Sequence, residues 1–210
     1  MARPSKPLIS RTSAAQAALD VIDERGLNEL SLSLVAKKLG VKPPSLYHHF
    51  KDKSELLQEV ARIMLLRLPP QMGAEQSYEE GLIARCVATR RALLRHPKAA
   101  ILILQYFPRY ILLSAYERTT REEPYPTSVQ MVVIEMVEKF TYGAALFEAS
   151  AHSRGVDPIP SVDPEKYPNF AKAIADNPFE EEELFIEALR IFLTGVRARI
   201  ESNSLGKPLV

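Results

Sequence analysis

Apolar residues recur at helical spacing along almost the whole chain, and this periodicity constrains the fold more than any other feature. The first stripe has the i, i+3, i+4, i+7 spacing of one helix face and consists of Ala15, Ala18, Leu19 and Ile22. No alternation of apolar and polar residues is sustained long enough to predict a strand. The sequence therefore predicts an all-α fold.

Glycines and prolines divide the first third of the chain into short helices. Gly26 and Gly40 are expected to end the first two helices, and Ser31 is the expected N-cap of the second. Pro43 and Pro44 suit the first turn of a third helix, because the missing N–H groups have no partner there in any case. Two short helices joined by a tight glycine turn are typical of a helix-turn-helix.

A fourth helix and a linker complete this region. Asp52 and Glu55 form a capping-box pattern before a new apolar stripe, and Pro69 and Pro70 stop it. We expect an N-terminal helix-turn-helix domain at residues 1–68, including the fourth helix. A larger helical domain is expected to follow.

The expected second domain, residues 69–210, is also helical. Its proline-rich stretch at residues 155–168 is expected to be an extended loop, and its last residues, 202–210, are expected to fray. Helices are expected at about residues 78–96, 98–105, 109–120, 127–154, 169–176 and 179–201.

Charge and cysteine content restrict the classes of partner and compartment. The net charge is +1, but residues 1–70 contain eleven Lys and Arg against seven Asp and Glu, which predicts an anionic partner for this part. The single cysteine, Cys86, cannot form an internal disulfide and is expected to be a small core residue rather than a redox sensor. Without a signal-peptide pattern or a long apolar run, we expect a cytoplasmic protein that does not enter a membrane.

The segment KPPSLYHHFKDK, residues 42–53, has the polarity that a DNA-reading helix needs. Leu46 and Phe50 can anchor it inward, while its other side chains offer hydroxyl, imidazole and ammonium groups. The alternative is a solvated helix with ordinary caps. Upstream, Arg3, Lys6 and Arg11 either add phosphate contacts or form a disordered tail.

The stretch GLNELSLSLVAKKLGVKPPSLYHHFKDK, residues 26–53, resembles the tetracycline-repressor (TetR) family. The A-x-x-L-G-V turn, the S-L-Y-x-H-F helix and the following K-x-K are its most specific parts. The resemblance implies a double-stranded DNA operator as partner, contacted by Ser31, Ser33, Lys42, Pro43, Pro44, Ser45, Tyr47, His48, His49 and Lys53. Ser33 and Leu34 depart from relatives that carry basic groups at these positions.

The segments KFTYGAALFEASAH and EEELFIEALRIFLTGVRARI look like the C-terminal domain of the tetracycline-repressor branch. This implies a homodimer in which the helices at Thr127–Arg154 and residues 179–201 pair with their copies in a four-helix bundle. Both helices are apolar over more than one stripe, which favours a second neighbour. Two recognition helices related by a two-fold axis would read a palindrome.

An effector pocket is expected inside the second domain, between its first four helices. Its candidate lining residues are Arg90, Leu94, Ile103, Tyr106, Phe107, Tyr110, Met136, Phe140, Phe147 and His152. The aromatic members suit plain core positions as well, and His152 suits a surface or dimer-interface position. In the tetracycline repressor a histidine ligates the drug's magnesium. Aligning His96 and Pro108 with that segment places Ile103 at its position, so we expect no metal, no cofactor and a hydrophobic small-molecule effector.

These observations predict a DNA-binding transcriptional regulator, a repressor released from a palindromic operator by its effector. A ligand-responsive activator or a non-enzymatic helical adaptor is the alternative. An enzyme is not expected, because the sequence contains no glycine-rich phosphate loop, nucleophile elbow or metal pair. A membrane-surface protein would need a basic amphipathic face, whereas here the basic residues flank a glycine turn.

Overall fold

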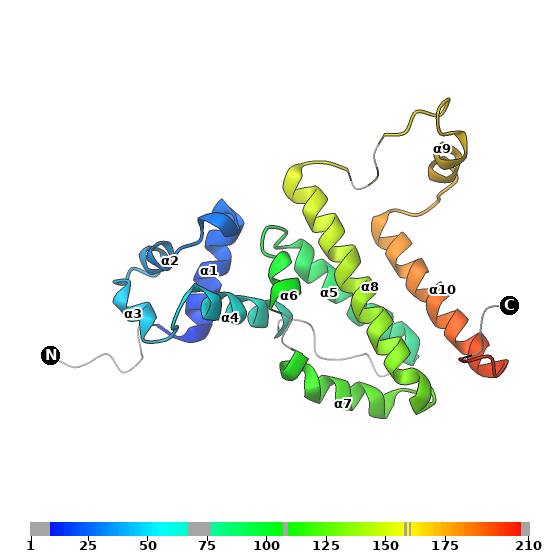
Figure 1. Ribbon diagram of the computed structural model, residues 1–210, viewed down its shortest axis with the longest axis horizontal. Coiled ribbons are helices and arrows are strands. Elements are labelled where there is room, and N and C mark those ends of the chain that lie inside the picture. Colours follow the sequence, from blue (N-terminus) through cyan, green and yellow to red (C-terminus); the bar gives the residue numbers. More distant parts are fainter. Residues whose placement is uncertain (1–8, 67–76, 107–108, 158, 160, 207–210) are drawn as a thin grey trace.

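The computed structural model describes residues 9–66, 77–106, 109–157, 159 and 161–206, and every regular element in these ranges is a helix (Figure 1). The N-terminal helices are α1 (Arg11–Arg25), α2 (Leu32–Lys38), α3 (Pro44–Tyr47) and α4 (Lys53–Leu66), with a short 3₁₀ turn, η1 (Leu27–Glu29), between α1 and α2. The remaining elements are α5 (Tyr78–Leu94), α6 (Ile101–Gln105), the 3₁₀ turn η2 (Arg109–Leu112), α7 (Leu113–Glu122), α8 (Thr127–Arg154), α9 (Pro168–Ala175) and α10 (Glu181–Glu201). The predicted all-α fold is confirmed.

Local sequence signals set several helix ends where the sequence predicts them. Gly26 ends α1 with a φ of 92°, and Gly155 ends α8 in the left-handed conformation. The Ser31 side chain accepts a hydrogen bond from the Leu34 N–H at 3.2 Å and so caps α2. These caps supply partners for backbone groups that the helix itself leaves unpaired.

Several helices are shorter than predicted, among them α3 and α6. Helix α3 ends at Tyr47, so Phe50 lies in the following turn, although its N–H still donates to the Leu46 carbonyl at 3.0 Å. Helix α6 begins only at Ile101, because residues 96–100 form tight turns in which the Ala99 N–H donates to the His96 carbonyl. The expectations for residues 1–8, 67–76 and 207–210, including Arg3, Lys6 and the linker prolines, lie outside the described residues.

A first apolar core joins the N-terminal helices to the rest of the molecule. It contains the buried faces of α1, α2, α3 and α4, and it continues into Leu93, Leu102 and Ile103 and into Ala145 and Ala149 of α8. Helix α4 packs on α1, α5 and α6. The helix-turn-helix therefore shares buried surface with the helices that follow it.

A second core holds α5, α8 and α10 together. Its members include Leu82 and Val87 of α5, Val133 of α8, and Leu189 and Leu193 of α10. Figure 1 shows α8 and α10 running side by side at the C-terminal end, while α9 projects away from both. No residue of α9 is buried, so this helix adds little to either core.

A buried ion cluster centred on Arg90 fixes the three helices of the second core. Arg90 is only 4% exposed, and its Nε donates to Glu148 of α8 at 3.0 Å while its Nη1 lies 3.1 Å from Glu182 of α10. Its guanidinium carbon also lies 5.6 Å from the centroid of the Phe185 ring. Glu182 belongs to a run of four glutamates, residues 180–183, at the start of α10.

We predict that Arg90→Ala destabilises the fold strongly, because removing one partner of a buried pair leaves Glu148 uncompensated. Losses of this kind cost about 3–5 kcal/mol. The matched control is Arg91→Ala, since Arg91 contacts the same Glu182 from an exposed position. Urea unfolding followed by circular dichroism measures both variants. Equal stability of the two variants would contradict the assigned role of Arg90.

Candidate nucleic-acid interface and cavities

The turn between α2 and α3 depends on a glycine. Gly40 has a φ of 68°, a conformation that side-chain-bearing residues rarely adopt. The Gly40 N–H donates to the Lys37 carbonyl, and the Val41 N–H donates to the Ala36 carbonyl at 3.0 Å. The chain therefore reverses within a few residues and leads directly into α3.

Helix α3 and the turn after it have one apolar face and one polar face. Leu46 and Phe50 are fully buried in the first core, whereas Tyr47 is 57% exposed. Pro43, Pro44 and His48 are exposed, and Ser45 and His49 are half-buried. Six of the side chains that the sequence predicts to contact DNA thus lie on one segment of the chain, residues 43–49, and the two predicted anchors are confirmed as buried.

Basic side chains flank this polar face. Lys42 precedes α3, Lys51 follows it, and both are exposed, while Lys53 is half-buried at the start of α4. Ser33 is also exposed on α2. Ser31, in contrast, is half-buried and its hydroxyl oxygen already caps α2, so a contact with DNA would have to share that group.

Arg11 clamps the polar face to the rest of the helix-turn-helix. Its guanidinium donates to the His49 carbonyl, pairs with Glu55 at 2.8 Å, and lies 4.5 Å from the centroid of the Phe50 ring. The Lys51 N–H and the Arg11 guanidinium both donate to Glu55 and hold the pKa of its carboxyl below the usual range. Arg11 therefore belongs to α1 and helps to anchor the turn after α3, rather than lying in a disordered tail.

The predicted capping box at the start of α4 is present only in part. The Glu55 N–H donates to Asp52 Oδ1 at 2.9 Å as expected, but the Glu55 carboxylate accepts from the Lys51 N–H rather than from that of Asp52. The carboxylate is thus used to close the turn after α3. These two backbone N–H groups at the start of α4 already have partners within the protein.

Polar contacts link the C-terminal end of α1 to the segment between α5 and α6. Asp23 Oδ2 lies 2.7 Å from Nδ1 of His96, and Lys98 Nζ donates to the Asp23 carbonyl at 2.8 Å. On the other side of this segment, Leu102 and Ile103 are buried in the first core. These contacts connect α1 to the segment that leads into α6.

A cavity of about 340 Å³, here called the central cavity, lies between α4, α5, α7 and α8. Its volume falls at the lower end of the range of small-molecule pockets. It is lined by Leu65, Tyr78, Leu82, Arg85, Ala88, Thr89, Leu112, Ala115, Tyr116, Arg118, Thr119, Val133, Ile134, Val137, Glu138 and Tyr142. A smaller hollow of about 80 Å³ adjoins it beside Cys86, and burial raises the pKa of that thiol, which keeps it protonated and unreactive.

The candidate ligand residues from the sequence do not line the central cavity. Arg90 belongs to the buried ion cluster, and Phe140 stacks on Phe185 with ring centroids 5.2 Å apart. Tyr110 and Phe147 are 74% and 82% exposed. The others lie in the first core or on the surface: Leu94, Ile103 and Tyr106 pack in that core, Met136 is half-buried, and His152 is exposed. Phe107 is outside the described residues.

Ile103 borders a different hollow. This hollow has a volume of about 280 Å³ and also contains Leu104, Gly143 and Leu146, between α6 and α8. The sequence does not predict the central cavity, because its walls come from helices far apart in the chain. The apolar stripes identify which side chains are inward, but they do not show where the packing leaves space.

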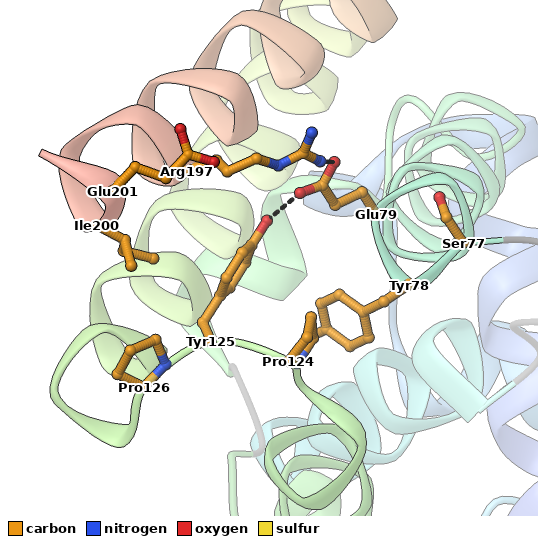
Figure 2. Close-up of a pocket in the computed structure, with 9 residues that line it drawn as sticks. All are labelled: Ser77, Tyr78, Glu79, Pro124, Tyr125, Pro126, Arg197, Ile200 and Glu201. Atoms are coloured by element: carbon orange, nitrogen blue, oxygen red, sulfur yellow. Dashed lines mark hydrogen bonds and ion pairs between the residues drawn. The ribbon is translucent and has the colours of Figure 1, made fainter.

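A further cavity, of about 370 Å³, lies at the end of α10 (Figure 2). The Tyr125 hydroxyl donates to Glu79 at 2.5 Å, and Arg197 pairs with the same carboxylate, so α5, α10 and the loop before α8 meet there. Burial opposes the ionisation of Glu79, but these two hydrogen bonds outweigh it and lower its pKa. Since the charges are paired with one another, this cavity is a structural junction.

Glu123 is a buried carboxyl group without a matched partner. It is 7% exposed, and neither of its carboxyl oxygens accepts a hydrogen bond within the described part of the chain. Burial raises its pKa to about 7, against the opposing influence of the Tyr78 hydroxyl. In the described ranges, no three His, Cys, Asp or Glu side chains are grouped closely enough to hold a metal ion.

An exposed polar recognition segment with an apolar back, followed by a helical region with an internal cavity, defines a DNA-binding regulator of the helix-turn-helix class. The family model for bacterial regulatory proteins of the tetR family matches residues 15–60, and the model for the tetracyclin repressor-like C-terminal domain matches residues 70–200. The chain therefore belongs to the tetR family, and it is a DNA-binding transcriptional regulator. Among its described helices, none is long and apolar enough to span a membrane.

Individual relatives agree with this assignment over nearly the whole chain. The tetracycline repressor protein class D of Escherichia coli is 29% identical over 203 residues, which cover 91% of each chain. The crystal structure of apo ActR from Streptomyces coelicolor matches with a TM-score of 0.74 at 20% identity, covering 95% of this chain and 100% of that one. A variant TetR from Acinetobacter baumannii AYE, solved in complex with minocycline, matches with a TM-score of 0.73 at 19% identity, covering 96% and 100%.

We predict that Glu123→Gln stabilises the protein more at about pH 8.5 than at about pH 5.5. The folded-state pKa of about 7 exceeds the usual 4.5, so the stability contributed by this group is complete below 4.5 and is lost as the pH rises through 7. Glutamine removes this loss. Thermal melts should show the variant gaining roughly 2–4 °C over the parent at the higher pH for each kcal/mol recovered.

The neighbouring exposed residue provides the control for this experiment. Glu122→Gln changes the same formal charge at a solvated position, and we expect its melting temperature to follow that of the parent at both pH values. A gain from Glu123→Gln that is independent of pH would contradict the raised pKa.

Proposed function

We propose that this regulator is a homodimeric repressor that leaves a palindromic operator when a small, largely apolar effector occupies the central cavity. The observation that carries the DNA-binding part is the division of residues 43–50 into a buried apolar back and an exposed polar face. We divide the chain into a DNA-binding domain at residues 1–68 and an effector-binding and dimerisation domain at residues 69–210.

The proposed operator contacts fall into two groups. Ser45, Tyr47, His48 and His49 would face base edges, because they lie on the exposed segment around α3. Phosphate contacts are proposed for the surrounding groups, namely Ser31, Ser33, Lys42, Pro43, Pro44 and Lys53. Lys51 is exposed at the same face and is added to the phosphate group.

The proposed dimer rests on apolar side chains that the single chain leaves exposed. Phe147 of α8 is 82% exposed, and Leu184 and Ile191 of α10 are 44% and 66% exposed. Exposed apolar residues on two adjacent helices favour a partner of the same shape. A four-helix bundle of α8, α10 and their copies would cover them and would set the distance between the two recognition helices.

The effector is proposed to act through α4 and α6. The central cavity has Leu65 of α4 in its wall, and α4 packs on α1 in the first core. Effector binding would favour a dimer in which the recognition helices no longer fit successive grooves, and it can do so only by binding that form more tightly. We propose a metal-independent effector, because Ile103, at the position aligned with the drug repressor's histidine, has no donor atom and is 1% exposed.

We predict that Tyr47→Ala and Lys53→Ala each weaken operator binding while leaving thermal stability unchanged. The Tyr47→Ala variant should discriminate less between the operator and unrelated DNA, by about 1–3 kcal/mol of binding free energy. The Lys53→Ala variant should bind all DNA sequences more weakly. The slope of its log binding constant against log salt concentration should be smaller by about 1. Gel shifts on an operator selected from a random library measure both effects, with Lys172→Ala, exposed on α9, as the control. Unchanged affinity in both variants would remove the proposed contact face.

We predict that Phe147→Glu converts the dimer into a monomer, because it places charges where two apolar surfaces meet. Light scattering after size-exclusion chromatography measures the mass. The control is Leu113→Glu on α7, which is 62% exposed and should remain dimeric. If Phe147→Glu also stays dimeric, the subunits associate through another surface.

A further inference from the structure

The lining of the central cavity contains more positive than negative charge available to a ligand. Three of its lining residues are charged, namely Arg85, Arg118 and Glu138. The Glu138 carboxylate already accepts hydrogen bonds from Arg109, at 3.0 Å, and from the Tyr116 hydroxyl. Its charge is therefore committed to groups other than the two arginines of the cavity.

Arg85 and Arg118 make no ion pair with any residue in the described ranges. Other arginines of this region differ, since Arg90 and Arg197 are both held by carboxylates. Arg85 is half-buried on α5, and its guanidinium carbon lies 6.0 Å from the centroid of the Tyr78 ring, which also lines the cavity. Arg118 is exposed on α7, so two separate helices each contribute a guanidinium group to the lining.

The rest of the lining is mostly apolar. Leu82, Val133, Ile134 and Val137 offer aliphatic surface, and Thr89 adds a hydroxyl group. A ligand that fills this space removes water from the half-buried Arg85. Such desolvation costs free energy unless the ligand supplies an opposite charge. An organic cation would be repelled by the two guanidinium groups. The Glu138 carboxylate would not offset this repulsion, because it is already paired.

We propose that the effector is an amphipathic anion: an apolar body that carries one carboxylate or similar acidic group, bound by Arg85 and Arg118. This inference rests on the proposed function, because it specifies the chemistry of the ligand for the same cavity. Arginine suits this task, since its planar fork of donors matches a carboxylate in a bidentate manner. The apolar body lies against the aliphatic walls contributed by α5 and α8.

Two fluorescent dyes with the same ring system test the proposal. Anilinonaphthalenesulfonate carries one anionic group, and phenylnaphthylamine is the same scaffold without it. In titrations containing a metal chelator, we expect the unaltered protein to bind the anionic dye at least about tenfold more tightly than the neutral dye. Equal affinity, or a preference for the neutral dye, would overturn the proposal. This comparison needs no variant.

Variants then locate the charge selection. The double variant Arg85→Gln with Arg118→Gln should lose about tenfold in affinity for the anionic dye and keep its affinity for the neutral one. Arg121→Gln is the matched control, because Arg121 is exposed on α7 and does not line the cavity. If the double variant binds the anionic dye as the parent does, the two arginines do not hold the acid.

A third variant separates this inference from the proposed function. Ala88→Phe fills the central cavity and should prevent binding of both dyes. If both dyes still bind, they occupy another surface and the proposed cavity site fails with the inference. If Ala88→Phe excludes both dyes but charge makes no difference, only the inference fails. Gel shifts on the same variants establish independently whether operator binding remains.

Discussion

The first apolar core, which runs from α1 through α4 into α6 and α8, is the constraint on which the rest of the structure depends. Leu46 and Phe50 are buried in it, so the direction of the recognition segment is fixed by the same packing that holds Leu102 and Ile103. Close-packed interiors do not absorb displacements locally. We therefore expect a displacement of α6 to shift α1 and α4 as well, because the three helices share this core.

Charged groups at the other end of the molecule hold the remaining helices in fixed relation. Arg90 ties α5 to α8 and α10, and Glu79 connects the start of α5 to Tyr125 and Arg197 (Figure 2). Helix α7 differs, because none of its residues is buried. The central cavity thus lies between α4, α5 and α8, which contribute buried residues to the two cores, and α7, which contributes none. Regions with few buried contacts open at the lowest free-energy cost, which makes α7 the wall best suited to admit a ligand.

The two candidate sites differ in how far the sequence predicts them. The recognition segment was predicted because its anchors, its polar groups and its glycine turn all lie within a dozen residues, where local rules apply. The central cavity was not, because Leu65, Arg85, Arg118 and Val133 come from four helices whose mutual positions no local pattern specifies. Aromatic residues at helical spacing, such as Phe140, proved to be packed against a neighbour instead.

The sequence by itself determined the helical class, the limits of most helices and the faces they bury, since periodicity, caps and glycines act through nearest neighbours along the chain. It also determined the exposed character of Tyr47 by placing Leu46 and Phe50 on the opposite face. Only the tertiary structure decided which charges are neutralised and where space remains. Arg11 and Arg90 pair with carboxylates distant in sequence, whereas Arg85 pairs with none in the described part of the chain. Such pairings depend on how whole helices pack against one another.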